Sequence, residues 1–264
     1  MNDSIARLGI DLDESVVDRL SRYLDLLLDV NQRVNLTAVR EWEAAWSRLI
    51  VDSLTVIPFL DEAEDGGLRV IDVGTGGGLP GLPMAIARPG WSVTMTDATG
   101  KKVDAVRGFI DSLGVENAEA VQGRAETMGH EAGHREAYDV AVCRGVGPMA
   151  EVLEYTLPLV RVGGAVLAMK GPKAEGELAE AGDAIEALGG GEVAVYDAYP
   201  EGFENDLVVV WVTKAAATPK GYPRQPGVPK REPIGVGGKS SGGRGGGGGG
   251  NRGGRGGAKA RRKG

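Results

Sequence analysis

The chain of 264 residues contains one cysteine, two histidines and only 5% aromatic residues. A single cysteine, Cys143, excludes an internal disulfide and a thiolate metal cluster, which fits a reducing compartment. The longest apolar run, from Leu207 to Val212, is far shorter than the roughly 20 residues that span a bilayer. The N-terminus also lacks the apolar stretch of a secretory signal peptide. These absences predict a cytoplasmic protein with no membrane segment.

Both histidines lie in His130-Glu131-Ala132-Gly133-His134, which spells the H-E-x-x-H pattern of zinc metalloproteases. That pattern binds zinc when it lies on a helix with an apolar face. Gly129 and Gly133 disfavour such a helix, and a third ligand would have to be a carboxylate because the chain has no other histidine. We therefore expect no metal site.

Acidic and basic residues are separated along the chain. Residues 1–213 carry 36 Asp and Glu against 17 Lys and Arg, whereas residues 214–264 carry one against 13. The body therefore has a net charge of −19 and the C-terminal part +12. An acidic body repels a polyanion, so a nucleic-acid partner would be attracted through the C-terminal part or a local basic patch.

The pattern of apolar residues divides the chain into four parts. Residues 1–66 read as a helical layer, with one helix capped by Asp13 and a second apolar stripe from Trp42 that stops at Pro58. Residues 67–214 form the main α/β domain. Residues 215–235 are rich in proline, and residues 236–264 are a Gly/Arg-rich basic tail that we expect to be disordered.

Short β-branched runs alternate with helical patterns in residues 67–214, which predicts a mostly parallel sheet with helices on both faces. The connection through Asn205 and Asp206 is too short for a crossover helix, so the last strand should be antiparallel. The seven predicted strands are Val70–Val73, Ser92–Thr96, Ala118–Val121, Asp139–Val142, Ala165–Met169, Glu192–Tyr196 and Leu207–Thr213.

A glycine-rich loop follows the first predicted strand and can be read in two registers. Gly76, Gly78 and Gly81 satisfy the dinucleotide pattern G-x-G-x-x-G, with Asp97 about 20 residues on to hold a ribose. Alternatively, Asp72-x-Gly74-x-Gly76 resembles the first motif of S-adenosylmethionine (SAM) methyltransferases. Pro80 and Pro83 favour the second register, because they remove N–H donors that a pyrophosphate would need and SAM carries no phosphate.

Ligands of doubly wound sheets bind at the carboxyl ends of the strands, where four loops of this chain should converge. Asp97 could accept hydrogen bonds from both ribose hydroxyls or precede the next helix as a cap, and Glu126 could face adenine or cap a turn. Arg144 should emerge at the mouth of the crevice, where it could hold a phosphate, a base edge or the cofactor, or else pair with Asp72. Lys170 is the other cation expected there.

The sequence lacks the groups that some base methylations require. No Asn-Pro-Pro-aromatic string follows the fourth strand, as amino-group methylases have, and Cys143 ends an apolar strand and is expected in the core rather than as a nucleophile. Guanine N7 has a free lone pair and no proton to lose. Its methylation needs alignment more than acid–base catalysis.

Several segments together resemble the RsmG (GidB) family of bacterial 16S rRNA guanine-N7 methyltransferases over roughly residues 14–235. They are Asn35-Leu36-Thr37-Ala38-Val39-Arg40, Asp52-Ser53 after Arg48, the loop from Asp72 to Gly81 with its Leu-Pro-Gly, Arg144, Met169-Lys170-Gly171 and the string from Tyr222 to Pro233. The resemblance implies a Rossmann-like class I SAM-dependent methyltransferase that acts on a guanosine in the decoding-region loop of the small ribosomal subunit.

The expected SAM contacts are Asp72, Gly74, Gly76, Leu79, Asp97, Ala125, Glu126 and Arg144, with Arg144 and Lys170 toward the RNA. We expect a monomer, and Arg144 is the one candidate for positioning the reactants. Two alternatives remain open, an NAD-dependent oxidoreductase and a non-catalytic RNA-binding protein that relies on its tail.

Overall fold

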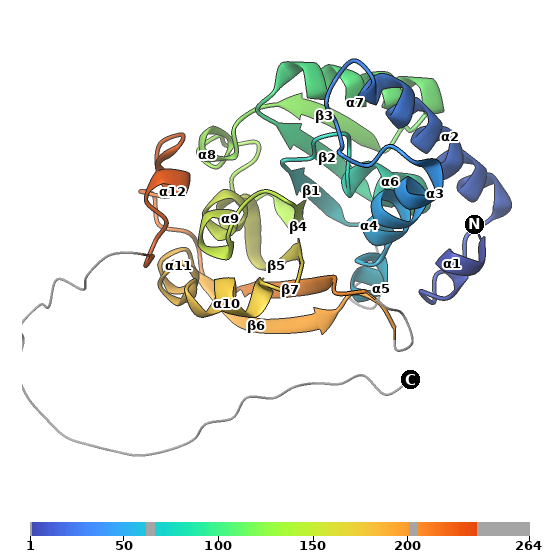
Figure 1. Cartoon of the computed structure of the whole chain (residues 1–264). Coiled ribbons are helices and arrows are strands. Elements are labelled where there is room, and N and C mark those ends of the chain that lie inside the picture. Colours follow the sequence, from blue (N-terminus) through green and yellow to red (C-terminus); the bar gives the residue numbers. More distant parts are fainter. Residues whose placement is uncertain (1, 62–66, 201–204, 237–264) are drawn as a thin grey trace, which may run out of the picture.

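A seven-stranded sheet organises the computed structural model, which describes residues 2–61, 67–200 and 205–236 (Figure 1). The strand order is β3-β2-β1-β4-β5-β7-β6. The strands β1 to β5 run parallel, and β7 is antiparallel to both β5 and β6. This arrangement confirms the predicted fold class. The strands are β1 Arg69–Val73, β2 Ser92–Asp97, β3 Ala118–Gln122, β4 Tyr138–Arg144, β5 Val160–Lys170, β6 Gly190–Asp197 and β7 Val208–Lys214.

Helices cover both faces of the sheet (Figure 1). One face carries α2 (Glu14–Asn31), α6 (Gly81–Ala87) and α7 (Gly100–Leu113), and the other carries α9 (Met149–Thr156) and α11 (Gly182–Ala187). The inner residues of α2, which include Leu20, Leu24 and Leu27, are buried and belong to the same core cluster as those of α6 and α7. The N-terminal helices therefore share one core with the sheet. No helix in the described part of the chain is long and apolar enough to cross a bilayer.

The N-terminal layer is more broken than its sequence pattern predicts. Asp13 immediately precedes α2, but its side chain makes no capping hydrogen bond. The stripe from Trp42 is divided into α3 (Trp42–Ala45), the π-helix η1 (Trp46–Val51) and α4 (Asp52–Leu54). The sequence predicts that Pro58 ends this stripe, and that prediction is wrong. It lies in the first turn of α5 (Ile57–Asp61), where the missing N–H is tolerated.

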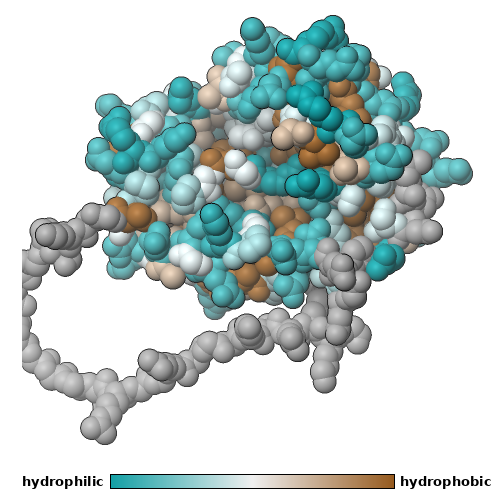
Figure 2. All heavy atoms as spheres, in the orientation of Figure 1, coloured by the Kyte–Doolittle hydropathy of each residue, from teal (hydrophilic) through white to brown (hydrophobic). Residues whose placement is uncertain are grey.

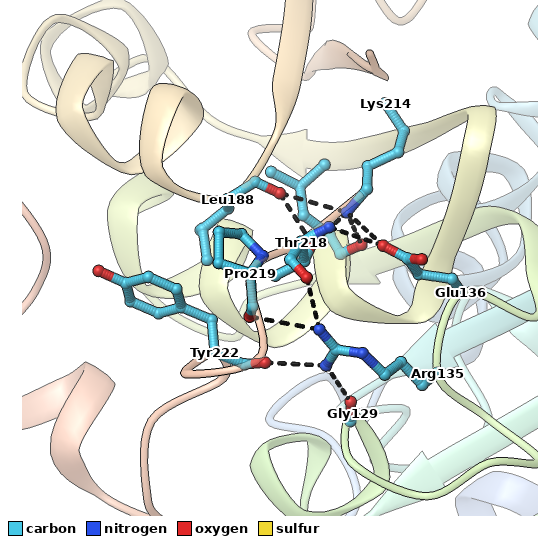
Figure 3. Close-up of polar contacts among 9 residues, drawn as sticks. Gly129, Arg135, Glu136, Leu188, Lys214, Thr218, Pro219 and Tyr222 are labelled. Atoms are coloured by element: carbon cyan, nitrogen blue, oxygen red, sulfur yellow. Dashed lines mark hydrogen bonds and ion pairs between the residues drawn. The ribbon is translucent and has the colours of Figure 1, made fainter. Parts of the chain in front are cut away.

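Residues 215–236 fold back over the α9 side of the molecule, and we call them the strap (Figure 1). The strap ends in the short helix α12 (Val228–Arg231), which contacts α9. Arg135 donates to the carbonyl oxygens of Gly129, Thr218 and Tyr222 at 2.6 to 2.8 Å (Figure 3). The tail from residue 237 onward, predicted to be disordered, lies outside the described residues.

A buried lysine completes the base of the strap. The Lys214 ammonium, which is inaccessible to solvent, donates to the carbonyl oxygens of Leu157 and Leu188 and to the Thr218 hydroxyl (Figure 3). Glu136 lies 3.6 Å from the ammonium and accepts from the Thr218 N–H. Burial lowers the pKa of Lys214 to about 8, although Glu136 opposes the shift.

Candidate active site

The glycine-rich loop between β1 and α6 is built around Asp72. This carboxyl is inaccessible to solvent, and its Oδ2 accepts from the Thr75 hydroxyl at 2.6 Å and from the Gly81 N–H at 2.9 Å. Its Oδ1 is buried and has no hydrogen-bond partner among the described residues. Burial raises the pKa of Asp72 to about 6, while the bonds from Thr75 and Gly81 lower it. Asp72 therefore shapes the loop from beneath.

The first turn of α6 has its N–H groups already occupied. Gly81 donates to Asp72 Oδ2, Leu82 to the Gly78 carbonyl and Met84 to the Pro80 carbonyl, while Pro83 has no N–H. Phosphate binding at a helix N-terminus depends on free N–H groups. The loop therefore suits a ligand without a phosphate at this position, as the proline argument predicted.

Two of the predicted glycines adopt backbone conformations that other residues rarely adopt. Gly74 and Gly76 have φ of +74° and +59°. A Cβ at position 74 would lie 2.8 Å from Val146 Cγ2, so the start of the loop is in direct contact with the loop after β4. Leu79 is buried in the core, 6% exposed, and its N–H donates to the Thr75 carbonyl. The bare backbone at Gly76 leaves room for a close approach by a ligand, whereas the corresponding space at Gly74 is taken by Val146.

Asp97 ends β2, and its side chain connects the loop after β1 with the start of α7. Its Oδ2 accepts from the Gly76 N–H at 3.1 Å and its Oδ1 from the Thr99 N–H at 2.8 Å. Lys102 Nζ lies 3.7 Å from Oδ2. Each carboxylate oxygen retains a second lone pair, so a ribose hydroxyl could still be accepted. Asp97 is not the helix cap considered from the sequence, because Thr99 is the N-cap of α7 and Asp97 bonds there only to the N–H of Thr99. The ribose interpretation remains a prediction.

Arg144 ends β4 at the same edge, and its partner is Asp52 rather than Asp72. The guanidinium donates to the Arg48 carbonyl of η1 at 3.0 Å and lies 3.9 Å from Asp52 Oδ2. Asp52 Oδ1 accepts from the Tyr199 hydroxyl at 2.5 Å. Burial lowers the pKa of Arg144 and raises that of Asp52, and their mutual attraction opposes both shifts. The N-terminal layer therefore holds the predicted arginine in place.

A cleft of about 420 Å³ opens beside Arg144, at the carboxyl ends of β4 and β5. Lys170 lines it as predicted, but its ammonium is already bonded to the Gly147 carbonyl and to Glu177 Oε2. Val146 belongs to both the cleft wall and the surroundings of Gly74, so the cleft adjoins the glycine loop. The lining residues are Arg144, Gly145, Val146, Gly147, Met169, Lys170, Gly171, Glu177 and Leu207.

The Ala125–Glu126 turn at the start of α8 (Ala125–Met128) faces the strap through its acid. Glu126 is 5% exposed, and its Oε1 accepts from the Gly227 N–H at 2.9 Å. This side chain is neither exposed for an adenine nor bonded to its own turn, the two roles considered from the sequence. Contacts with a cofactor at this position would come from the backbone and from Ala125.

The remaining reactive side chains are set apart from the cleft. Burial raises the pKa of the Cys143 thiol to about 12, so the side chain is a core residue and a poor nucleophile, as expected. His130 Nε2 lies 2.7 Å from the Pro223 carbonyl, and His134 Nδ1 lies 2.7 Å from the Tyr138 hydroxyl. The two histidines thus serve different structural contacts, and the described ranges contain no group of three potential metal ligands.

Sequence reasoning did not assign site roles to Asp52, Tyr199 or Glu177. Asp52 and Tyr199 lie more than 100 residues apart in the sequence. Glu177 lies in the short helix α10 (Ala174–Ala179), whose sequence pattern indicates only a solvated face. In the structure, the π-helix directly before Asp52 indicates a functional role for this residue, because π-helices are frequent at functional sites.

The sheet order and the loop after β1 define the fold of class I SAM-dependent methyltransferases. A solved SAM-dependent O-methyltransferase from Thermotoga maritima is similar in fold, with a TM-score of 0.50 and 14% identity over 73% of this chain and 72% of that one. At that identity the likeness concerns the fold alone.

Sequence relatives then define the family. Residues 17–201 match the family model GidB, rRNA small subunit methyltransferase G. The ribosomal RNA small subunit methyltransferase G of Moorella thermoacetica is 41% identical over 226 residues, 86% of this chain and 93% of that protein. Its counterpart from Pelotomaculum thermopropionicum is 39% identical over 236 residues, 89% and 97% of the two chains. The chain therefore belongs to the rRNA small subunit methyltransferase G family, which confirms the predicted resemblance.

Proposed function

We propose that this enzyme transfers the methyl group of SAM to N7 of a guanosine in the decoding-region loop of 16S rRNA. The observation that carries the proposal is that Val146, which lines the cleft, also lies against Gly74. The acceptor cleft is therefore next to the glycine loop. A methyl donor on the loop and a base in the cleft would then be aligned for direct transfer.

The residues present fit SAM. Gly76 leaves space for its methionyl part, since the nearest atom to a Cβ there is the Leu36 carbonyl oxygen at 3.9 Å, and Gly74 provides the left-handed turn that begins the loop. Asp97 can accept its ribose hydroxyls, and Ala125 with the Glu126 backbone would border its adenine. When bound, SAM supplies a methyl group activated by a positively charged sulfur. Asp72 and Leu79 support the loop from the buried side. Arg144, held by Asp52 and Arg48, remains at the cleft wall to orient the RNA or the cofactor.

Guanine N7 is the acceptor that this site serves most simply. C5 methylation of a pyrimidine needs a thiolate, and the Cys143 thiol is buried and protonated. Among the described cleft residues the one carboxylate, Glu177, is paired with Lys170. N7 presents a lone pair and loses no proton, so it requires neither a nucleophile nor a free base.

Mass spectrometry of rRNA from a strain lacking the gene, before and after treatment with the purified full chain and SAM, tests the proposal. We expect one guanosine to gain a methyl group at N7.

Equilibrium binding of SAM and of NAD is the second measurement, and we expect the chain to bind SAM and not NAD. Micromolar NAD affinity without SAM binding would support an oxidoreductase, and RNA binding without any methyl transfer would support a non-catalytic role. Light scattering tests our further proposal that the chain is a monomer.

A further inference from the structure

Lys170 and Glu177 form an ion pair in the wall of the cleft. Lys170 Nζ lies 2.8 Å from Glu177 Oε2, and the two side chains are 10% and 27% exposed. The ammonium also donates to the Gly147 carbonyl, which fixes its direction. One of its three N–H bonds remains available, and no hydrogen bond from the described residues reaches Glu177 Oε1.

The pair presents a donor beside an acceptor, which matches the Watson–Crick edge of guanine. Uracil shares the first two groups, O4 and N3–H, but has an acceptor where guanine has its N2 amino group. The Watson–Crick edge of guanine has an acceptor, O6, next to two donors, the N1–H and the N2 amino group. Adenine reverses the first two positions, with a donor at N6 and an acceptor at N1. An ammonium beside a carboxylate is therefore complementary to guanine and repels adenine.

We propose that Lys170 donates to O6 and Glu177 accepts from N1–H and N2–H of the acceptor guanine. This inference rests on the proposed function and deepens it by naming the residues that select the base. Unstacked bases in RNA loops are commonly read on this edge. Recognition there leaves N7 without a bond, as methylation requires.

The rest of the cleft suits a flat base. Val146 and Leu207, both partly exposed, line it with apolar side chains that can contact the ring faces. Arg144 lines the same cleft and can take a neighbouring phosphate, a contact that carries no base information. Figure 2 shows that the viewed surface is largely hydrophilic, with apolar residues visible toward its middle.

Inosine in place of the target guanosine isolates the Glu177 contact. Inosine keeps O6, N1–H and N7 but lacks the N2 amino group, so one hydrogen bond to Glu177 is lost. We expect kcat/KM of the wild-type chain to fall about tenfold on this RNA. Glu177→Ala should methylate both RNAs equally well, and Glu177→Gln should show a reduced preference. Because each result is a ratio within one variant, partial loss of folded protein cancels.

Glu175→Gln is the matched control, since Glu175 is exposed on the same short helix α10 (Ala174–Ala179) and does not line the cleft. It should keep the tenfold preference. An equal preference in the wild type and Glu177→Ala, or no preference in the wild type, would overturn the inference while leaving the proposed function in place. Methylation at an atom other than guanine N7 in the wild type would overturn the proposed function itself.

Discussion

Among single residues, Asp72 makes the clearest contribution to pH dependence. Its pKa is raised from 3.8 to about 6 in the folded chain, chiefly by burial. Between these values the folded state holds a proton that the unfolded state has lost. The stability due to this group is therefore fully present below about pH 4 and is lost as pH rises through 6.

Asp72→Asn removes this titration, so the stability difference between the wild type and the variant should depend on pH. A shift of about two pKa units predicts that the wild type loses about 3 kcal/mol relative to the variant between pH 4 and 7. Urea unfolding of both proteins across that range measures the difference. A constant difference would show that the carboxyl is already ionised when folded at low pH.

Tyr199 is linked to Arg144 through Asp52. Tyr199→Phe deletes the hydroxyl that donates to Asp52 Oδ1 and should reduce stability by about 1 kcal/mol. Methyl transfer should fall several-fold, because Asp52 then constrains Arg144 less. Tyr196→Phe on β6 is the control, since Tyr196 contacts Phe59 through its ring. Steady-state kinetics would contradict this role if both variants matched the wild type.

At the scale of elements, the ion pair of Arg224 with Glu154 joins the strap to α9. Arg224 donates to both oxygens of Glu154 at 2.6 to 3.1 Å, and the Glu154 side chain is fully buried. Arg224→Ala should therefore cost about 3 kcal/mol, because it leaves a buried carboxylate without its partner. Arg231→Ala on α12, which removes an exposed cation, should cost less than about 1 kcal/mol. Guanidinium chloride unfolding compares the two, and equal losses would contradict the argument.

Most strands were predictable because they contain β-branched runs; β3, with the one β-branched residue Val121, is the exception. All seven strands lie within five residues of their predicted bounds. The strand β5 begins at Val160, five residues early, because Arg161 in its first part pairs with Asp139 of β4. The breaks in the N-terminal layer were not predictable, since tertiary packing determines where an apolar stripe changes from α to π geometry. The same holds for Asp52 and Glu177, whose partners lie in other elements.

At the scale of the whole molecule, charge is divided between an acidic body and a basic C-terminal part. The body repels RNA and the last 30 residues carry eight Lys and Arg. Affinity should therefore depend on the tail, whereas base choice depends on the cleft.

Deletion of residues 237–264 removes those eight charges and should flatten the salt dependence of RNA binding, with the slope of log K against log salt falling by up to about 6. Methylation should remain on the same guanosine. A tail of equal length with Gln at the eight positions is the control, and it should behave like the deletion. A lost preference for guanine would contradict this division of roles.

The occupied first turn of α6 also affects which metabolites can compete at the site. Most adenosine derivatives in a cell carry phosphates, ATP foremost among them. A phosphate chain at this loop would meet N–H groups already in use and a carboxyl below them. We therefore expect this loop to bind ATP and other phosphorylated adenosines poorly, so that they would compete little with SAM.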